Sequence, residues 1–272
     1  MIFPKSIISS DVRKLFETLG AENVRFVGGC VRNALMCLPV GDIDLATTLT
    51  PDEVIAKLSK ARIKNIPTGI DYGTVTAAMN GIGYEITTLR RDVATDGRRA
   101  VVAYTEEWAE DAARRDFTVN CLYWQPISRE LLDPHAGEKD LAERLVRFIG
   151  EPVIRIRHDA LRLLRAIRLR AAIGGQYEPA THAALRSEAP LLASLSGPRV
   201  LQELEKLLAG PSPDRALRDW EETGALEILL PELRACRGIA QPRDYHREGD
   251  VLEHLLRCVA SFLPDDGLDV RL

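Results

Sequence analysis

Two short acidic stretches carry the residue types best suited to chemistry. Asp42 and Asp44 stand one residue apart in DIDLAT (42–47), whose alternation predicts a strand with both carboxylates on one face. Two close carboxylates repel each other unless a cation lies between them, and hard oxygen ligands with open positions suit Mg²⁺. Glu85, in a second predicted strand (83–89), is the natural third carboxylate. Taken alone, two acids at this spacing are more often solvated side chains at a strand edge.

A glycine pair precedes the acidic stretch. The run VRFVGG (24–29) predicts a strand that breaks at Gly28 and Gly29, and a helix is expected over 30–36. Glycines at such a junction expose backbone N–H groups to an anion, and Arg32 adds a charged fork. A glycine pair alone indicates only a turn, but a phosphate cradle before an acidic strand indicates nucleotidyl transfer.

Three adjacent charged residues follow an acidic run at 106–111. Arg114 and Arg115 are candidates to hold a triphosphate or a ribose, and Asp116 is a candidate acceptor for a sugar hydroxyl. The alternative is a salt-bridged helix face, and the pattern alone favours neither interpretation.

The segment 155–170 holds six arginines and one acid. Asp159 and Arg162 are three residues apart and are expected to share a helix face. Aspartate only accepts hydrogen bonds and arginine only donates them, so the pair matches the pairing edges of cytosine and adenine and leaves groups unpaired against guanine and uracil. Arg165 is a further candidate for nucleotide binding. The commoner meaning of such a run is a partly buried helix with a solvated basic side.

The secondary structure that positions these residues is predicted to change along the chain, from strands with helices to helices alone. The first part predicts an N-terminal mixed sheet with flanking helices, and the second an all-helical region, which together make an α+β protein. We place the boundary near residue 150. Further elements expected in the first part are helices at 9–19 and from 50–53, and strands at 73–79 and 101–104.

Composition narrows the class of protein. The 272 residues fit roughly two domains, and 46% apolar with 28% charged residues excludes a disordered chain, a collagen-like fibre and a disulfide scaffold. The net charge of −4 excludes a generally basic coat, although 29 of the 36 basic residues are arginine. Five cysteines without a CxxC pair indicate reduced thiols in the cytoplasm and no structural zinc. No membrane span or secretory signal is expected, and the oligomeric state is not predicted.

The motifs, taken in order, resemble those of class II tRNA nucleotidyltransferases, the CCA-adding enzymes, a family that includes bacterial poly(A) polymerases. The similarity covers about 25–175 and continues through SGPRVLQELEKLLAG and ETGALEILLPEL. Its six successive motifs are GGCVRNALM, DIDLATTLTPDEV, YEITTLRRDVATDGRR, EDAARRDFTVNCLY, LLDPHAGEKDL and RHDALRLLRAIRLR.

The resemblance implies a polymerase-β-like nucleotidyltransferase head at 1–150 and a helical neck and body at 151–240 that selects nucleotide and binds RNA. It implies addition of CMP and AMP, from CTP and ATP, to the tRNA 3′ end without a nucleic-acid template, by two-metal chemistry. By this resemblance, Asp42 and Asp44 bind Mg²⁺ and Glu85 is the supporting carboxylate. Gly28, Gly29 and Arg32 bind the triphosphate, and Arg114, Arg115 and Asp116 contact the ribose and phosphates. Asp159 and Arg162 select the base.

Several alternatives remain open at this point. The segment 90–105 matches the family's flexible loop for switching from C to A, which argues against a CC-only enzyme but not against an A-only one. A poly(A) polymerase is expected to carry a basic C-terminal extension. A non-catalytic RNA-binding relative would not need the three carboxylates.

The chain also departs from the family pattern. Asn33 stands where the family usually has Asp, His158 replaces the usual Glu, and His135 with Ala136 replaces the common Phe-Gly. Residues 241–272 resemble the opening of an HD-type helical body but end before an HD dyad is expected, so we expect a truncated or naturally short form.

Overall fold

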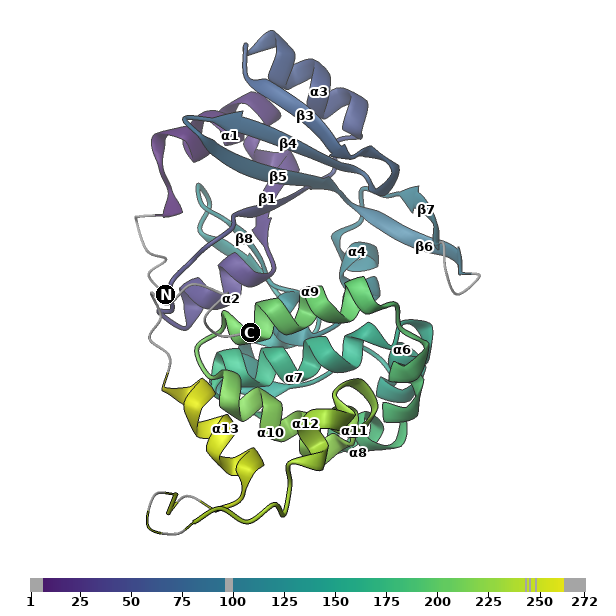
Figure 1. Cartoon of the computed structure of the whole chain (residues 1–272). Coiled ribbons are helices and arrows are strands. Elements are labelled where there is room, and N and C mark those ends of the chain that lie inside the picture. Colours follow the sequence, from purple (N-terminus) through teal and green to yellow (C-terminus); the bar gives the residue numbers. More distant parts are fainter. Residues whose placement is uncertain (1–6, 96–99, 243, 245, 248, 262–272) are drawn as a thin grey trace. The chain divides into compact units, whose positions relative to one another are not determined.

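We describe a computed structural model of the chain. It describes residues 7–95, 100–242, 244, 246, 247 and 249–261. The chain divides into two compact units, Met1–Ala142 and Glu143–Leu272, each described by itself below (Figure 1). We call them the head and the helical unit.

The head contains a mixed sheet of seven strands in the order β3-β4-β5-β2-β1-β8-β9. Neighbouring strands are antiparallel except β2 and β5, which run parallel. The strands are β1 (Val24–Val27), β2 (Asp44–Thr47), β3 (Lys64–Gly69), β4 (Thr74–Met79), β5 (Ile82–Thr88), β8 (Tyr123–Gln125) and β9 (Glu130–Leu132).

Local sequence signals start and stop the helices of the head. The first helix is capped by Ser9, whose hydroxyl accepts from Val12 N at 3.2 Å, and ends at Gly20 with φ 91°. Thr50 and Glu53 form a capping box at the start of the third. The helices are α1 (Ser10–Leu19), α2 (Gly29–Leu35), α3 (Pro51–Lys60), α4 (Trp108–Arg114) and α5 (Gly137–Ala142).

Aromatic rings join α1 to the sheet. Phe16 meets Phe26 with ring centroids 5.3 Å apart, and Phe26 meets Trp124 at 5.7 Å. In β2 and β5, Leu45 and Ile86 are buried while the residues before them lie on the other face. The core therefore fixes one face of these strands and leaves the opposite face for polar side chains.

The strands expected at 24–29, 42–47, 73–79, 83–89 and 101–104 are present, with shifted ends. The sequence does not predict β3, because Pro67 and the polar residues of KNIPTG interrupt any alternation. Nor does it predict β8 and β9, which have three residues each. In β3, Pro67 is tolerated because this strand forms an edge of the sheet.

The segment 90–105, expected to be a flexible loop, contains two strands. β6 (Arg90–Thr95) pairs antiparallel with β7 (Ala100–Tyr104) as a separate two-stranded sheet, with a register shift between Asp92 and Ala94. The connection at 96–99 lies outside the described residues.

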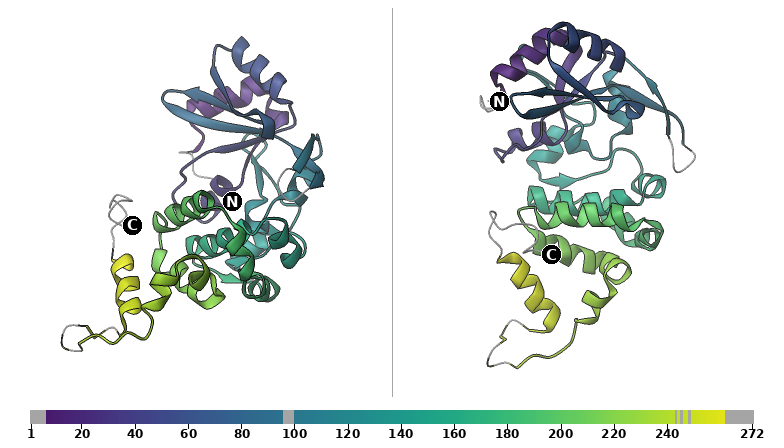
Figure 2. Two further views of the ribbon diagram at one scale, coloured as in Figure 1. Left: turned by 45° about the vertical axis from the view of Figure 1, so that its right-hand side comes forward. Right: turned by 45° about the horizontal axis from the view of Figure 1, so that its top comes forward.

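The helical unit is built around α7. Its residues Leu163, Leu164 and Ile167 are buried, as is Trp220 of α10, and α7 runs alongside α9 (Figures 1 and 2). Two short parallel strands, which the sequence analysis did not predict, also lie here. The elements are β10 (Leu145–Val146), α6 (Pro152–His158), α7 (Leu161–Ile173), β11 (Gln176–Tyr177), α8 (Pro179–Ser187), α9 (Gly197–Leu208), α10 (Pro213–Thr223), α11 (Ala225–Leu229), α12 (Pro231–Ala235) and α13 (Val251–Ala260).

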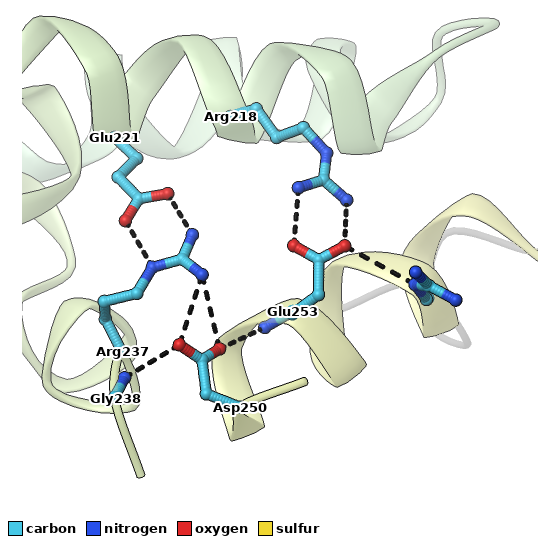
Figure 3. Close-up of polar contacts among 7 residues, drawn as sticks. Arg218, Glu221, Arg237, Gly238, Asp250 and Glu253 are labelled. Atoms are coloured by element: carbon cyan, nitrogen blue, oxygen red, sulfur yellow. Dashed lines mark hydrogen bonds and ion pairs between the residues drawn. The ribbon is translucent and has the colours of Figure 1, made fainter. Parts of the chain in front are cut away.

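Ion pairs attach α13 to α10 (Figure 3). Arg218 donates to both oxygens of Glu253 at 2.7 and 2.8 Å. Arg237 pairs with Glu221 and with Asp250, and Asp250 caps α13 by accepting from Glu253 N at 2.8 Å. The part of 241–272 that the structure describes is thus held to the preceding helices.

Candidate active site

The glycine pair forms the junction between β1 and α2, as the sequence predicts. Gly28 has φ 77°, a backbone conformation that favours glycine. A β-carbon at Gly28 would lie 3.9 Å from Asp44 Oδ2, and one at Gly29 would lie 3.7 Å from Arg32 Nη2. The junction therefore brings bare backbone beside a carboxylate and a guanidinium.

Asp44 and Glu85 come together through the parallel pairing of β2 and β5. They are direct register partners, so their side chains leave the same face of the sheet. Asp44 is half-buried and Glu85 is exposed. Burial, and then the charges of Glu85 and Asp42, raise the pKa of Asp44, and the charge of Arg115 opposes that rise. Three carboxylates and one guanidinium thus act on one another here.

Asp42 lies outside the strand in which the sequence places it. β2 begins at Asp44, so Asp42 precedes the strand and strand alternation does not place it. It is exposed, and its charge nevertheless contributes to the raised pKa of Asp44. The second carboxylate therefore lies at a bend before β2 and not in the strand itself.

The donor set fits a divalent cation that keeps open positions. Among the residues that the structure describes, no three His, Cys, Asp or Glu side chains are grouped so that they could hold an ion by themselves. Repulsion around Asp44 is nevertheless the condition that a cation relieves. Mg²⁺ needs few protein ligands, because water and substrate phosphates fill the rest of its shell.

Arg32 is oriented by two asparagines. Its Nε and Nη2 donate to Asn33 Oδ1 at 3.1 and 2.9 Å, and its Nη1 donates to Asn120 Oδ1 at 2.5 Å. Asn33 Nδ2 in turn donates to Pro39 O at 2.9 Å. Asn33, the departure from the family pattern, therefore still orients Arg32, now through a neutral amide. Asn120 ends a short 3-10 helix (Thr118–Asn120), and it was missed because a single Asn far along the chain from Arg32 carries no sequence signal of their contact.

Arg114 and Arg115 are held by one buried carboxylate, Asp111, which is 1% exposed. Arg114 donates to its Oδ1 at 2.9 and 2.6 Å, and Arg115 donates to its Oδ2 at 2.9 Å. Burial by itself would raise the pKa of Asp111, but the charges of Arg115 and Arg114 and a hydrogen bond from Tyr123 bring it below its ordinary value. The ion pairs confirm the predicted salt bridges. They also hold both guanidinium groups in place, so they do not exclude the binding of a nucleotide by the same arginines.

Asp116 is buried, and its Oδ1 accepts from Phe117 N at 2.9 Å. Asp111 was recognised only as part of an acidic run. The signal that would have found it is its spacing: three and four residues before the two arginines, it shares their face of α4.

Asp159 and Arg162 do not share one helix, which corrects the sequence analysis. α6 ends at His158, Asp159 is extended with φ −155° and ψ 106°, and Arg162 lies in the first turn of α7. Asp159 Oδ1 accepts from Leu161 N at 3.1 Å, and its two oxygens accept from Arg199 Nη2 at 3.0 and 2.9 Å. Arg162 Nη1 donates to Arg155 O at 2.9 Å.

Arg199 was missed as a partner of Asp159 because it lies 40 residues away on α9. Arg165 is on α7, one turn after Arg162, and is half-buried. His158 is exposed at the end of α6. Burial lowers the pKa of His135, and nothing in the structure explains its presence in place of the common Phe.

Two family models match the chain. Residues 24–147 match the poly A polymerase head domain, and residues 176–236 match the probable RNA and SrmB- binding site of polymerase A. The chain is similar to the mitochondrial CCA tRNA nucleotidyltransferase 1 of Danio rerio, with 40% identity over 85% of this chain and 51% of that protein. It is also similar to the CCA-adding enzyme of Geobacillus thermodenitrificans, with 40% identity over 76% of this chain and 50% of that enzyme.

A solved structure agrees with these similarities. The Bacillus stearothermophilus CCA-adding enzyme in complex with CTP matches with a TM-score of 0.75 and 34% identity, over 93% of this chain and 57% of that one. Together with the fold, these matches define the class: a head domain of the poly A polymerase type followed by a helical region of the type that binds RNA in polymerase A. More specifically, the chain belongs to the family of class II tRNA nucleotidyltransferases and bacterial poly(A) polymerases. It spans about half the length of the curated relatives it matches.

Proposed function

We propose that the protein adds CMP and then AMP, from CTP and ATP, to the 3′ end of tRNA without a nucleic-acid template. The observation that carries this proposal is the register pairing of Asp44 with Glu85 beside the Gly28 backbone. A binding module has no need of mutually repelling carboxylates at a glycine turn. The relatives named above, a CCA tRNA nucleotidyltransferase and two CCA-adding enzymes, support this choice of reaction.

Nucleotidyltransferases generally use a divalent metal, and we propose Mg²⁺ here. Asp42 and Asp44 would hold it, with Glu85 as the supporting carboxylate. When bound, Mg²⁺ lowers the pKa of the attacking hydroxyl and stabilises the departing pyrophosphate. The carboxylates must be ionised to bind a cation, and the charge of Arg115 favours the ionised form of Asp44.

The head residues also position the nucleotide. Gly28 and Gly29 present backbone to the triphosphate, and Arg32 supplies a guanidinium that Asn33 and Asn120 orient. Arg114 and Arg115 contact ribose and phosphates, with Asp116 as the acceptor for a sugar hydroxyl. Arginine suits this task because its planar fork matches phosphate oxygens.

Base choice is assigned to the helical unit. Asp159 and Arg162 offer an acceptor and a donor to cytosine and adenine, and Arg165 follows on the same side of α7. Arg199 holds the Asp159 carboxylate in place. We assign the catalytic nucleotidyltransferase domain to 1–150, which extends a few residues past the end of the head at Ala142. We assign nucleotide selection and RNA binding to 151–240, and the start of an HD-like body to 241–272.

In the part of the chain that the structure describes, no helix is long and apolar enough to cross a bilayer. We propose a cytoplasmic location. All five cysteines lie within the described residues and are free thiols, which supports a reducing compartment. Fractionation of cells that express the tagged protein tests this, and recovery in an organelle would contradict it.

The test of the reaction is product sequencing. Purified protein is incubated with Mg²⁺, CTP and ATP, and with tRNA ending at the discriminator base, at C or at CC. Completion of CCA on all three substrates is expected. Long A tails would identify a poly(A) polymerase, extension of only the CC-ended substrate an A-adding enzyme, and products ending at CC a CC-adding enzyme. Binding of tRNA without incorporation would leave a non-catalytic RNA-binding relative.

A further inference from the structure

The hydroxyl of Tyr123 lies between a buried carboxylate and a candidate nucleotide-binding arginine. It donates to Asp111 Oδ2 at 2.7 Å and accepts from Arg115 Nε at 2.9 Å. Arg115 Nε also donates to the same Asp111 oxygen at 2.9 Å. The three side chains thus close a triangle of hydrogen bonds. Tyr123 is 0% exposed, so bulk water does not compete for these bonds.

The ring of Tyr123 is fixed as firmly as its hydroxyl. Arg115 Cζ lies 5.2 Å from its centroid, and Trp108 meets it edge-on with centroids 5.3 Å apart and planes at 77°. Arg25 Cζ lies over the Trp108 ring at 4.6 Å. Aromatic and cation–π contacts of this kind stabilise one ring position.

Arg115 needs such a support. An arginine side chain has many rotamers. Nε and Nη2 of Arg115 both lie on one oxygen of Asp111, at 2.9 and 2.8 Å, and contact with a single oxygen restrains the guanidinium plane less than a fork on both oxygens would. The Tyr123 hydroxyl, as a second acceptor on Nε, adds the missing restraint. The orientation matters because a planar guanidinium donates to phosphate oxygens only along its N–H directions.

We propose that Tyr123 is a positioning residue, whose hydroxyl fixes the guanidinium of Arg115 in the orientation that receives the phosphates of the incoming nucleoside triphosphate. This proposal rests on the proposed function. Burial raises the pKa of Tyr123, so the hydroxyl keeps its proton and remains a donor to Asp111. Tyr123 lies eight residues beyond Arg115 on another element, so sequence spacing alone did not reveal it.

The chain offers a matched control. Tyr177, in the helical unit, donates to Asp219 Oδ2 at 2.7 Å, and Arg170 Cζ lies 5.1 Å from its ring centroid. Tyr177→Phe therefore removes a comparable hydroxyl, but from a group that we have not assigned to nucleotide binding. Tyr123→Phe removes the hydroxyl next to Arg115 and keeps the ring.

The experiment measures KM and kcat for CTP and ATP with both variants. Loss of one hydrogen bond to a charged partner predicts that Tyr123→Phe raises KM about tenfold, with kcat within about twofold of wild type. Tyr177→Phe is expected to lower the thermal midpoint and leave KM unchanged. The proposal is overturned if Tyr123→Phe leaves KM unchanged, or if Tyr177→Phe raises KM equally.

A double-mutant cycle separates positioning from general destabilisation. The effect of Tyr123→Phe should disappear in an Arg115→Lys background, because lysine has no Nε to hold. A full effect in that background contradicts the proposal. If Tyr123→Phe does not fold, Trp108→Phe, which only loosens the ring, is expected to raise KM about twofold, and an unchanged KM contradicts the proposal.

Direct CTP binding keeps the two proposals apart. If wild-type protein binds CTP but incorporates neither nucleotide, the proposed function fails. The positioning role is then judged by the Kd for CTP, which should rise about tenfold in Tyr123→Phe. An unchanged Kd refutes the role independently of turnover.

Discussion

Each unit contains a buried aspartate that joins a tyrosine hydroxyl to an arginine, but the two clusters are bonded differently. In the head, Tyr123 and Arg115 share one oxygen of Asp111 and bond to each other, whereas in the helical unit Tyr177 and Arg170 bond to different oxygens of Asp219. Both hydroxyls donate at 2.7 Å, and the arginines lie 5.2 and 5.1 Å from the tyrosine rings. The head triad is Tyr123, Asp111 and Arg115, and the helical triad is Tyr177, Asp219 and Arg170.

The two triads differ in what lies around them. The arginine of the head triad acts on Asp44, and Arg114 shares its aspartate. The helical triad joins α7, β11 and α10 within its own unit. Two clusters of the same residue types therefore differ in two ways: the head triad has a direct bond between its tyrosine and its arginine, and its arginine acts on a carboxylate of the candidate site.

The largest effect is expected from the carboxylate to which the head triad is coupled. Asp44→Asn should reduce nucleotide incorporation by about 1,000-fold or more, because it removes a proposed metal ligand at the reacting phosphate. Incorporation of labelled CMP into tRNA measures this. tRNA binding should remain within about threefold of wild type. Turnover near the wild-type rate would refute the catalytic assignment.

The next effect separates the triads directly. Asp111→Asn and Asp219→Asn should each lower the free energy of unfolding by about 3 kcal/mol, because each removes the buried carboxylate that pairs with a half-buried arginine. Only Asp111→Asn should also lower kcat/KM, by about 100-fold, through misplaced Arg114 and Arg115. Urea unfolding measures the free energy of unfolding, and kinetics at temperatures below the thermal midpoint of each variant measure kcat/KM. A similar kinetic loss in Asp219→Asn would erase the distinction.

A smaller effect concerns selection in the helical unit. Arg162→Ala should admit UTP and GTP and lower the preference for CTP over UTP by about tenfold, since one donor to the base edge is lost. Competition between labelled CTP and UTP measures this. Arg168→Ala, on the same helix but paired with Glu203 at 2.8 Å, is the control and should leave the preference unchanged. Intact discrimination in Arg162→Ala would place selection elsewhere.

The smallest effect is on the dependence of stability on pH. The pKa of Asp44 is raised, so its ionised form destabilises the fold increasingly as pH rises from about 4 through the folded-state pKa. Without divalent cation, Asp44→Asn should therefore be more stable than wild type at pH 7 and equal to it at acidic pH. Mg²⁺ should remove the difference. The pKa of Asp111 is lowered, so its contribution is present above pH 4 and is lost as pH falls through its folded value.

The sequence predicted what depends on local pattern. Strong alternation located β2 and β5, and the cap at Ser9 located α1. It could not predict Asp159 as the break between two helices, since the apolar spacing continues through the residue. Contacts across distant segments, such as Arg199 with Asp159 or Asn120 with Arg32, arise only on folding.

Pro67 in β3 has a consequence for how the protein behaves at high concentration. This strand ends the head sheet, and proline offers no backbone N–H there, while Lys64 places a charge on the same strand. A strand of a second copy could not form a continuous hydrogen-bond ladder with β3, even though the neighbouring Ile66 is 39% exposed. This edge of the sheet is thereby protected from pairing with the sheet of a second copy.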